Sequence, residues 1–348
     1  AARGQDTLFE DGVDFQGTQV REEPDASNQQ SDLFTLAGAD TVAQRSPDSA
    51  FNVDGATEVL SAPKGEFGTV TSTKRTVTYS LPDAPIKTAA DAATATAQVR
   101  KAAQENLIAL VTDADGNVLD LIRHSIGDIS SANANPSIIA GSVLRVQGAE
   151  NAWVSHNHPG GVSSLSNADR DVFSRLKNIM DGSGITVQGM LAIGDSTYSS
   201  TSREAADVNE APVPPARRTR SVQVSERSIQ RREKLGDAIL SSDRAFEAVT
   251  DLGGNQSGVM LLNQRNLPVA WVPVELGEMS QLRDTGVLSR LLSSIERSNA
   301  NQAILSVGGN NFQGPTTREI AGNMRRFFMD ADVRLLDILS TEPRASLS

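Results

Sequence analysis

The sequence predicts a mixed α/β (α+β) protein with two tandem domains, each a mixed sheet flanked by helices, after a disordered or extended N-terminal tail. Apolar, strand-like runs alternate with capped helical segments, which is typical of sheets layered with helices. A similar order of elements recurs at a spacing of about 150 residues. Residues 1–60 are polar and show no sustained period of either kind. The expected boundaries are a tail over 1–60, a first domain over 61–205, a basic linker over 206–232 and a second domain over 233–348.

The composition indicates a chain without a membrane span and without thiol chemistry. Its 348 residues are 38% hydrophobic, and no apolar run approaches the roughly 18 residues that a membrane helix needs. No apolar stretch follows the first residues, so we expect no signal peptide there. The absence of cysteine fits a reducing compartment, and we expect a cytoplasmic protein. The formal net charge of −11 disfavours broad binding along a nucleic-acid backbone but leaves a local basic patch open.

The first half of the first domain reads as strand, helix and hairpin. The expected elements are a strand over 69–81, a helix over 89–104, a strand over 107–111 and a strand over 118–124. Thr88 is placed to cap the helix. The polar turn over 113–117 resembles the start of a calcium loop. However, His124 stands where such a loop needs a carboxylate, so we expect a plain turn.

The second half of that domain alternates helix and strand. The expected elements are a helix over 137–147, a short strand over 152–154, a helix over 167–180 and a strand over 185–193. Pro136 opens the first of these helices and Ser166 caps the second.

Two of the three histidines of the chain follow the short strand with one residue between them. His156 and His158, with Ser166 and Asp169, form the pattern H-x-H-x7-S-x2-D. Two imidazoles, one carboxylate and a free fourth position make the ligand set of an open, catalytic zinc site. The alternative is a polar turn in which Ser166 and Asp169 form only a helix capping box.

Residues 206–232 are the most basic part of the chain. Six arginines stand here or close by, at positions 217, 218, 220, 227, 231 and 232. A solvated linker is the simplest interpretation, and a dock for nucleic acid or an acidic partner is the alternative. A helix from about Ser228 is expected to lead into the final segment.

Residues 68–202 resemble the RadC-type branch of the JAB/MPN (JAMM) metal-dependent hydrolases. The HNHP-x-G loop, the serine eight residues on and the aspartate three later match that family's central motif. Supporting similarities lie over 86–92, 105–110 and 194–200. The chain differs from RadC-like proteins in three places: residues 1–60 show no DNA-binding helix-hairpin-helix pattern, Ser137-Ile138 replaces an Arg-Glu pair, and Gly160 replaces a serine.

The resemblance implies a Zn²⁺ ion held by His156, His158 and Asp169, with water in the fourth position. It assigns Glu105 as the general base, and Glu150 is the alternative carboxylate. It also implies that Ser166 donates a hydrogen bond to the oxyanion, a role compatible with capping. We expect His124 to be a packed or surface histidine rather than a ligand.

The second domain repeats the first without its chemistry. The strand–turn–strand pattern over 258–272 copies that over 107–123, and Val307-Gly308-Gly309 falls where the two histidines stood. Thr316 and Glu319 parallel the serine and aspartate of the motif. We therefore expect a degenerate JAB-like domain without metal ligands, although convergent α/β patterning could produce part of the similarity.

Three functions fit these observations. The first is a zinc hydrolase of amide or isopeptide bonds with a protein or peptide substrate. The second is a RadC-like activity on nucleic acid, which the acidic charge disfavours. The third is a scaffold whose JAB-like domains only bind partners, and the second domain suits that role or packing on the first. The resemblance also suggests a bacterial, phage or plasmid origin.

Overall fold

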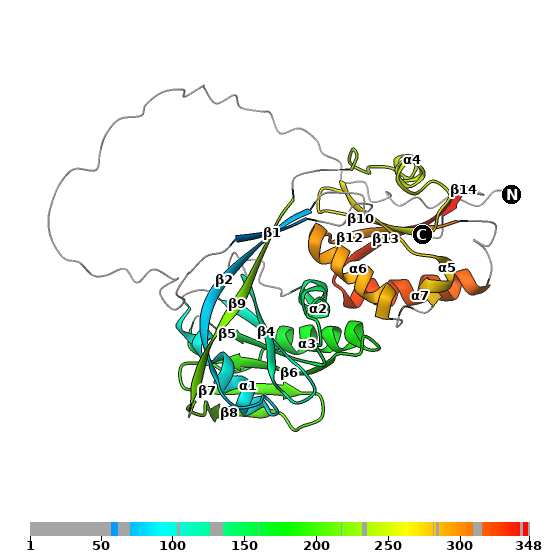
Figure 1. The fold of residues 1–348 in the computed structure, drawn as a ribbon. Helices are drawn as coiled ribbons and strands as arrows, with labels where there is room; N and C mark the ends of the chain where they lie inside the picture. Colours follow the sequence, from blue (N-terminus) through cyan, green and yellow to red (C-terminus); the bar gives the residue numbers. More distant parts are fainter. Residues whose placement is uncertain are drawn as a thin grey trace, which may run out of the picture.

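The computed structural model contains two sheets, each flanked by helices (Figure 1). The residues that it describes are 57–61, 70–102, 105–125, 135–158, 160–216, 218–231, 235–280, 282, 285–308, 315–341 and 344–346. The predicted tail lies outside these residues up to position 56, and its last residues enter strand β1. In the described part of the chain no helix is long and apolar enough to cross a membrane.

The first sheet has nine strands in the order β1-β2-β9-β4-β3-β5-β6-β7-β8 among the described residues. Their bounds are β1 Thr57–Ser61, β2 Val70–Pro82, β3 Asn106–Thr112, β4 Val118–Ser125, β5 Asn151–Asn157, β6 Thr186–Ile193, β7 Thr197–Ser202, β8 Val208–Pro212 and β9 Thr219–Arg231. Strand β3 is buried along its whole length, because it is central in the sheet and helices cover both faces.

Helices cover the two faces of this sheet unequally. Helix α1 (Ala89–Thr96) and the 3-10 turn η1 (Ala97–Lys101) pack on one face. Helices α2 (Pro136–Leu144) and α3 (Asn167–Met180) pack on the other. The predicted caps are confirmed: Thr88 and Ser166 each form a capping box with the aspartate three residues later.

Two elements differ from the sequence prediction near this sheet. The helix expected over 89–104 ends as α-helix at Thr96 and continues only as the 3-10 turn. The Thr94 and Thr96 hydroxyls donate to carbonyls four residues back, an interaction that weakens regular helix. The helix expected over 137–147 ends at Leu144.

The segment 206–232, expected as a basic linker, instead contributes strands β8 and β9 to the first sheet. Strand β9 pairs with β2 along all 13 residues, and on its other edge Ser225 and Glu226 pair with β4. The two strands form a long ribbon that reaches toward the second sheet (Figure 1). The helix expected from Ser228 is absent from the described residues, because β9 continues to Arg231 and α4 begins at Ser242.

The second sheet has five strands in the order β11-β10-β12-β13-β14 among the described residues. Their bounds are β10 Gly258–Leu262, β11 Pro268–Pro273, β12 Gln302–Val307, β13 Arg334–Thr341 and β14 Arg344–Ser346. The helices are α4 Ser242–Gly253, α5 Leu276–Ser280, α6 Thr285–Ser298 and α7 Pro315–Asp330. Helix α4 covers one face, and α6 and α7 cover the other.

The second sheet repeats the strand order of the centre of the first. The order β4-β3-β5-β6-β7 corresponds to β11-β10-β12-β13-β14, with the same succession of two antiparallel, one parallel and one antiparallel pairing. Helices α2 and α6 occupy the same place in the two orders, between the hairpin and the next strand. The second sheet therefore has the strand order and the pairing directions of the centre of the first sheet.

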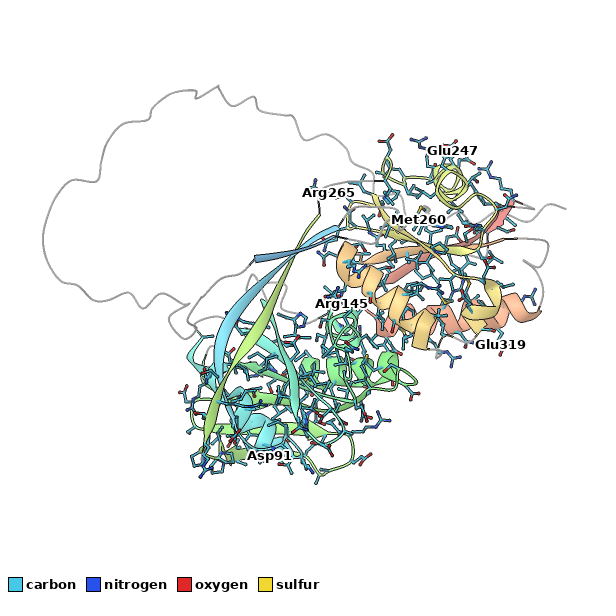
Figure 2. All side chains as sticks on the ribbon, viewed as in Figure 1. Asp91, Arg145, Glu247, Met260, Arg265 and Glu319 are labelled. Carbon is cyan, nitrogen blue, oxygen red and sulfur yellow. The ribbon has the colours of Figure 1, made fainter. Side chains whose placement is uncertain are left out.

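The two halves share one apolar core and pack through these equivalent helices. Gly141 of α2 lies so close to α6 that a Cβ atom there would stand 2.6 Å from the Leu292 carbonyl oxygen. Arg145 forms an ion pair with Glu296, whose side chain is only 1% exposed. Figure 2 shows Arg145 at the boundary between the two halves.

Candidate metal centre

Strand β5 places His156 at the centre of the first sheet. Its neighbour in β3 is Leu107 and its neighbour in β6 is Ala192. Ala152 and Val154 belong to the core on the α2 and α3 side, and alternation along the strand puts His156 on that same face. The residue is 1% exposed, whereas the side chain of His158, just beyond the strand, is 27% exposed.

The first turn of α3 brings Asp169 to the same point. One carboxylate oxygen, Oδ2, accepts hydrogen bonds from the Ser166 backbone N–H at 2.7 Å and from its hydroxyl at 2.8 Å. The other oxygen, Oδ1, lies 3.3 Å from Nε2 of His156. The capping box therefore fixes the carboxylate and leaves one oxygen facing the imidazole.

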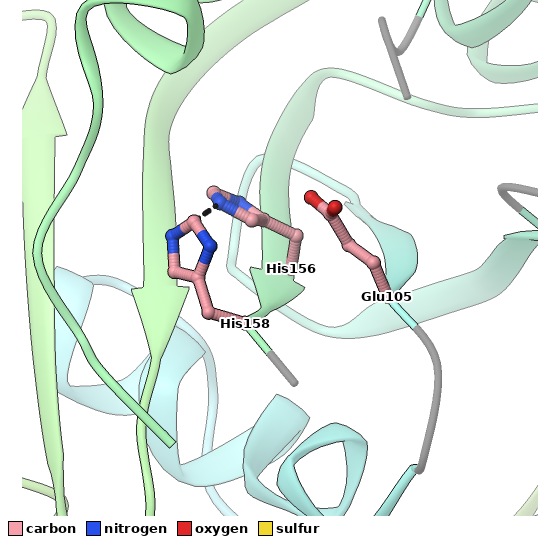
Figure 3. A group of neighbouring side chains, drawn as sticks. All are labelled: Glu105, His156 and His158. Atoms are coloured by element: carbon pink, nitrogen blue, oxygen red, sulfur yellow. Dashed lines mark hydrogen bonds between the residues drawn. The ribbon is translucent and has the colours of Figure 1, made fainter. Parts of the chain in front are cut away.

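Glu105 enters from the segment between η1 and β3. A carboxylate oxygen of Glu105 and one ring nitrogen each of His156 and His158 all lie within 4.8 Å of one another. Figure 3 shows the carboxylate pointing toward the two rings from the segment that leads into β3. Four side chains thus converge from three parts of the chain: the segment before β3, the end of β5 with the residue after it, and the first turn of α3.

Two of the three separations between donor atoms match those around a tetrahedral ion: Nε2 of His156 lies 3.3 Å from Nε2 of His158 and 3.3 Å from Oδ1 of Asp169. In the third pair, Nε2 of His158 lies 3.9 Å from Oδ2 of Asp169. Zinc–donor bonds of about 2.0–2.1 Å at tetrahedral angles put neighbouring donor atoms about 3.3–3.4 Å apart. The structure therefore brings His156, His158 and Asp169 together, with His158 and Asp169 farther apart than the other two pairs.

The electrostatics of the cluster also favour a cation. Burial raises the pKa of the Asp169 carboxyl, but the hydrogen bond and charge of His156 and the Ser166 hydrogen bonds outweigh it and hold the pKa well below its usual range. Nε2 of His156 and Nε2 of His158 face each other beside this carboxylate, 3.3 Å apart. An ionised carboxylate and two imidazole lone pairs form the donor set that Zn²⁺ and related metals prefer.

The remaining predicted residues lie in different places. Ser166 is exposed, and its hydroxyl both donates to Asp169 Oδ2 and accepts from the Asp169 N–H, so it is a cap. His124 is half-buried in β4, where its Nε2 lies 3.1 Å from the Ser142 hydroxyl. Glu150 is exposed and precedes β5. It lies at the opposite end of the strand from His156, about 20 Å away at strand rise, so it is too distant to be the base.

Sequence reasoning missed the hydrogen bonds that surround Glu105. Asn157, between the two histidines, accepts a hydrogen bond from the backbone N–H of Asn106 at 2.8 Å. Asn106 in turn accepts one from Nε of Arg123 at 2.7 Å. All three residues are buried. The only sequence signal was Asn157 itself, the middle residue of the H-x-H motif. Its hydrogen-bond partners could be known only from the register of β3 on β5.

The protein-family comparison places a known domain on this site. Residues 86–206 match the family model described as the RadC-like JAB domain. This stretch contains Glu105, both histidines and Asp169. Residues 86–206 are a RadC-like JAB domain.

Curated relatives match within the same domain. A UPF0758 protein of Syntrophotalea carbinolica is 31% identical over 103 residues, which are 30% of this chain and 45% of the relative. UPF0758 proteins of Shewanella piezotolerans and Shewanella woodyi are 31% and 32% identical over 98 residues, 28% of this chain and 43% of each relative. The chain thus spans less than half the length of these bacterial relatives, and the likeness concerns the RadC-like JAB domain alone.

Proposed function

We propose that this protein is a zinc-dependent hydrolase of the JAMM type that cleaves an amide or isopeptide bond with an activated water. The observation that carries the proposal is the convergence of His156, His158 and Asp169, whose nearest donor atoms lie 3.3–3.9 Å apart, with the Glu105 carboxylate within 4.8 Å of the histidine nitrogens. The match of residues 86–206 to the RadC-like JAB domain supports the proposal.

His156, His158 and Asp169 would hold the metal in this proposal. When bound, zinc lowers the pKa of a coordinated water to about 7 and polarises a carbonyl group. Strand β5 fixes His156 and the capping box fixes Asp169, so little reorganisation of these two donors is needed.

Glu105 takes the role of general base. Its carboxylate lies beside the donor atoms and on a different element, so it can accept a proton from the attacking water and return it to the leaving amine. Ser166 can support this step only in part. Its hydroxyl proton is engaged by Asp169, so donation to an oxyanion requires the hydroxyl to rotate away from the cap.

The test combines metal analysis with a panel of substrates. We expect about one zinc per purified chain, and hydrolysis of peptide or ubiquitin-like isopeptide substrates that a chelator abolishes. Single- and double-stranded DNA are the competing substrates, because a RadC-like role on nucleic acid is the alternative. Cleavage of DNA alone, or a metal-loaded chain that binds peptides without cleaving any, would contradict the proposal and favour the other two functions.

We further propose that the second half is a degenerate JAB-like domain, and its turns support this. In the first half Asp113 Oδ1 accepts from the N–H groups of Asp115 and Asn117. In the second half Asn263 Oδ1 accepts from those of Arg265 and Leu267. Both hairpins also have a register shift at the corresponding pair of residues.

Left-handed backbone positions recur at matching places too. The pairs, each at the same distance before a corresponding strand, are Gly116 and Asn266, Gly148 and Asn299, and Gly184 and Asp332. Glycine, asparagine and aspartate are the residues that tolerate positive φ. The metal ligands have no counterpart, because the buried Val307 and then Gly308 stand at the end of β12. Glu319 is exposed on α7. We assign this half a structural or partner-binding role.

A further inference from the structure

Asn157 uses both ends of its side-chain amide, although it is 1% exposed. Its Oδ1 accepts a hydrogen bond from the backbone N–H of Asn106 at 2.8 Å. Its Nδ2 donates one to the backbone carbonyl of Ala102 at 3.3 Å. Both contacts join segments that are more than 50 positions apart in the sequence.

These two backbone groups lie on either side of Glu105. Ala102 ends the 3-10 turn that precedes it, and Asn106 is the first residue of β3. One side chain on the histidine-bearing strand therefore holds the chain before and after the carboxylate. Arg123 of β4 adds a second restraint, because its Nε donates to Oδ1 of Asn106 at 2.7 Å.

Asn157 cannot reach the metal centre itself. Successive side chains of a strand point to opposite faces, so Asn157 lies on the α1 side while His156 faces α3. Its strand partner Ile193 belongs to the core on the α1 side, which agrees with this placement. Any influence of Asn157 on the site must pass through the backbone around Glu105.

We propose that Asn157 is a positioning residue that fixes Glu105 relative to the two histidines. The proposal rests on the function assigned above to Glu105. A base must stay within hydrogen-bond reach of the proton that it removes, and a displacement of about 1 Å can cost about 100-fold in rate. An amide side chain suits the task because it supplies an acceptor and donors together.

The test compares two asparagines of the same strand. Asn157→Ala removes both restraints on the Glu105 segment. Asn151→Ala is the matched control, since Asn151 also bridges two partners, the Asp113 carbonyl at 3.1 Å and the Gln188 side chain at 2.6 Å, but at the far end of β5. The measurements are amide hydrogen exchange at residue 106, zinc content, and kcat and KM separately.

For Asn157→Ala we expect exchange at residue 106 to accelerate about tenfold or more, with zinc content unchanged. We expect kcat to fall about 10- to 100-fold while KM stays near the wild-type value. Asn151→Ala should change none of these. Unaltered exchange at residue 106, or equal effects of the two variants, would overturn the proposal. So would wild-type turnover despite faster exchange.

Asn157→Asp keeps the test decisive if the alanine variant does not fold. It retains an acceptor for the Asn106 N–H but loses the donor to the Ala102 carbonyl, so its exchange and kcat should lie between wild type and a full loss. Exchange and zinc content need no substrate. A failure to find hydrolysis would therefore count against the proposed function, whereas unchanged exchange would count against the tether.

Discussion

The second sheet has the strand order of the centre of the first, but the two halves differ in the side chains at the end of one strand. Buried His156 is the last residue but one of β5, whereas buried Val307 is the last residue of β12. The strands on both sides of that position keep their pairing and burial in both halves. Strand cores and turn residues thus maintain the strand order in both halves, whereas the candidate centre depends on four side chains of the first half.

The comparison extends to how the halves meet. Helix α2 leads into the strand that carries the histidines, and α6 leads into its counterpart. The two helices contact each other closely, and the shared apolar core includes residues of both sheets. The second half therefore packs against the helix that precedes the candidate metal centre.

The largest expected effect concerns metal binding. His156→Ala or His158→Ala should reduce zinc content from about one ion per chain to near zero, because either change removes one of three donors. His124→Ala is the control, since it changes the third histidine of the chain, which contacts Ser142 rather than the cluster. Emission spectrometry of the purified proteins measures this. Equal zinc content in all variants would show that the two histidines of the first half do not hold the metal.

The second prediction separates the base from the ligands. Glu105→Gln should keep zinc and lower kcat by about 100- to 10,000-fold, the range for loss of general-base catalysis. Asp169→Asn should lose both, because it removes the negative charge that faces His156 at 3.3 Å. Metal content and turnover are measured on the same samples. Full hydrolysis by Glu105→Gln would assign the base to another group.

The third prediction tests the contact between the halves. Gly141→Ala should destabilise the protein by about 1–3 kcal/mol, because the added methyl group stands 2.6 Å from a backbone oxygen of α6. Gly322→Ala is the control: nothing lies within 4 Å of its added Cβ, and alanine in a helix should be neutral or stabilising by up to about 1 kcal/mol. Urea unfolding measures both. If the two variants were equally stable, α2 and α6 would be able to move apart far enough to accommodate the added methyl group.

Local signals in the sequence predicted much of this fold. The capping box of Ser166 and Asp169 located the start of α3, and the polar turn over 113–117 located the hairpin of β3 and β4. Strand β9 was missed because its arginines obscure the alternation of Val222 and Val224. Its partner β2 is also distant in sequence.

Contacts between segments that are distant in sequence were also missed at the candidate site. The spacing of the motif predicted the three converging ligand candidates, since strand β5 and the first turn of α3 are adjacent in sequence. Glu105 required the family resemblance, and the tether through Asn157 required the pairing of β3 with β5. Contacts that depend on sheet register cannot be obtained from spacing along the chain.

The smallest expected effect concerns the two matching turns. The side-chain hydrogen bond from Asn117 is the largest cause that holds the pKa of the Asp113 carboxyl below its ordinary value. A carboxyl group whose pKa is lowered on folding stabilises the turn at a pH above its ordinary pKa. This stabilisation is lost as the pH falls through the pKa of the folded state. Asn263 makes the same backbone contacts without an ionisable group. The amide resonance of Asn117 should therefore titrate in acid while that of Leu267 stays constant. Asp113→Asn should remove the difference. Parallel titration of both amides would mean that acid acts on the whole chain rather than on this carboxylate.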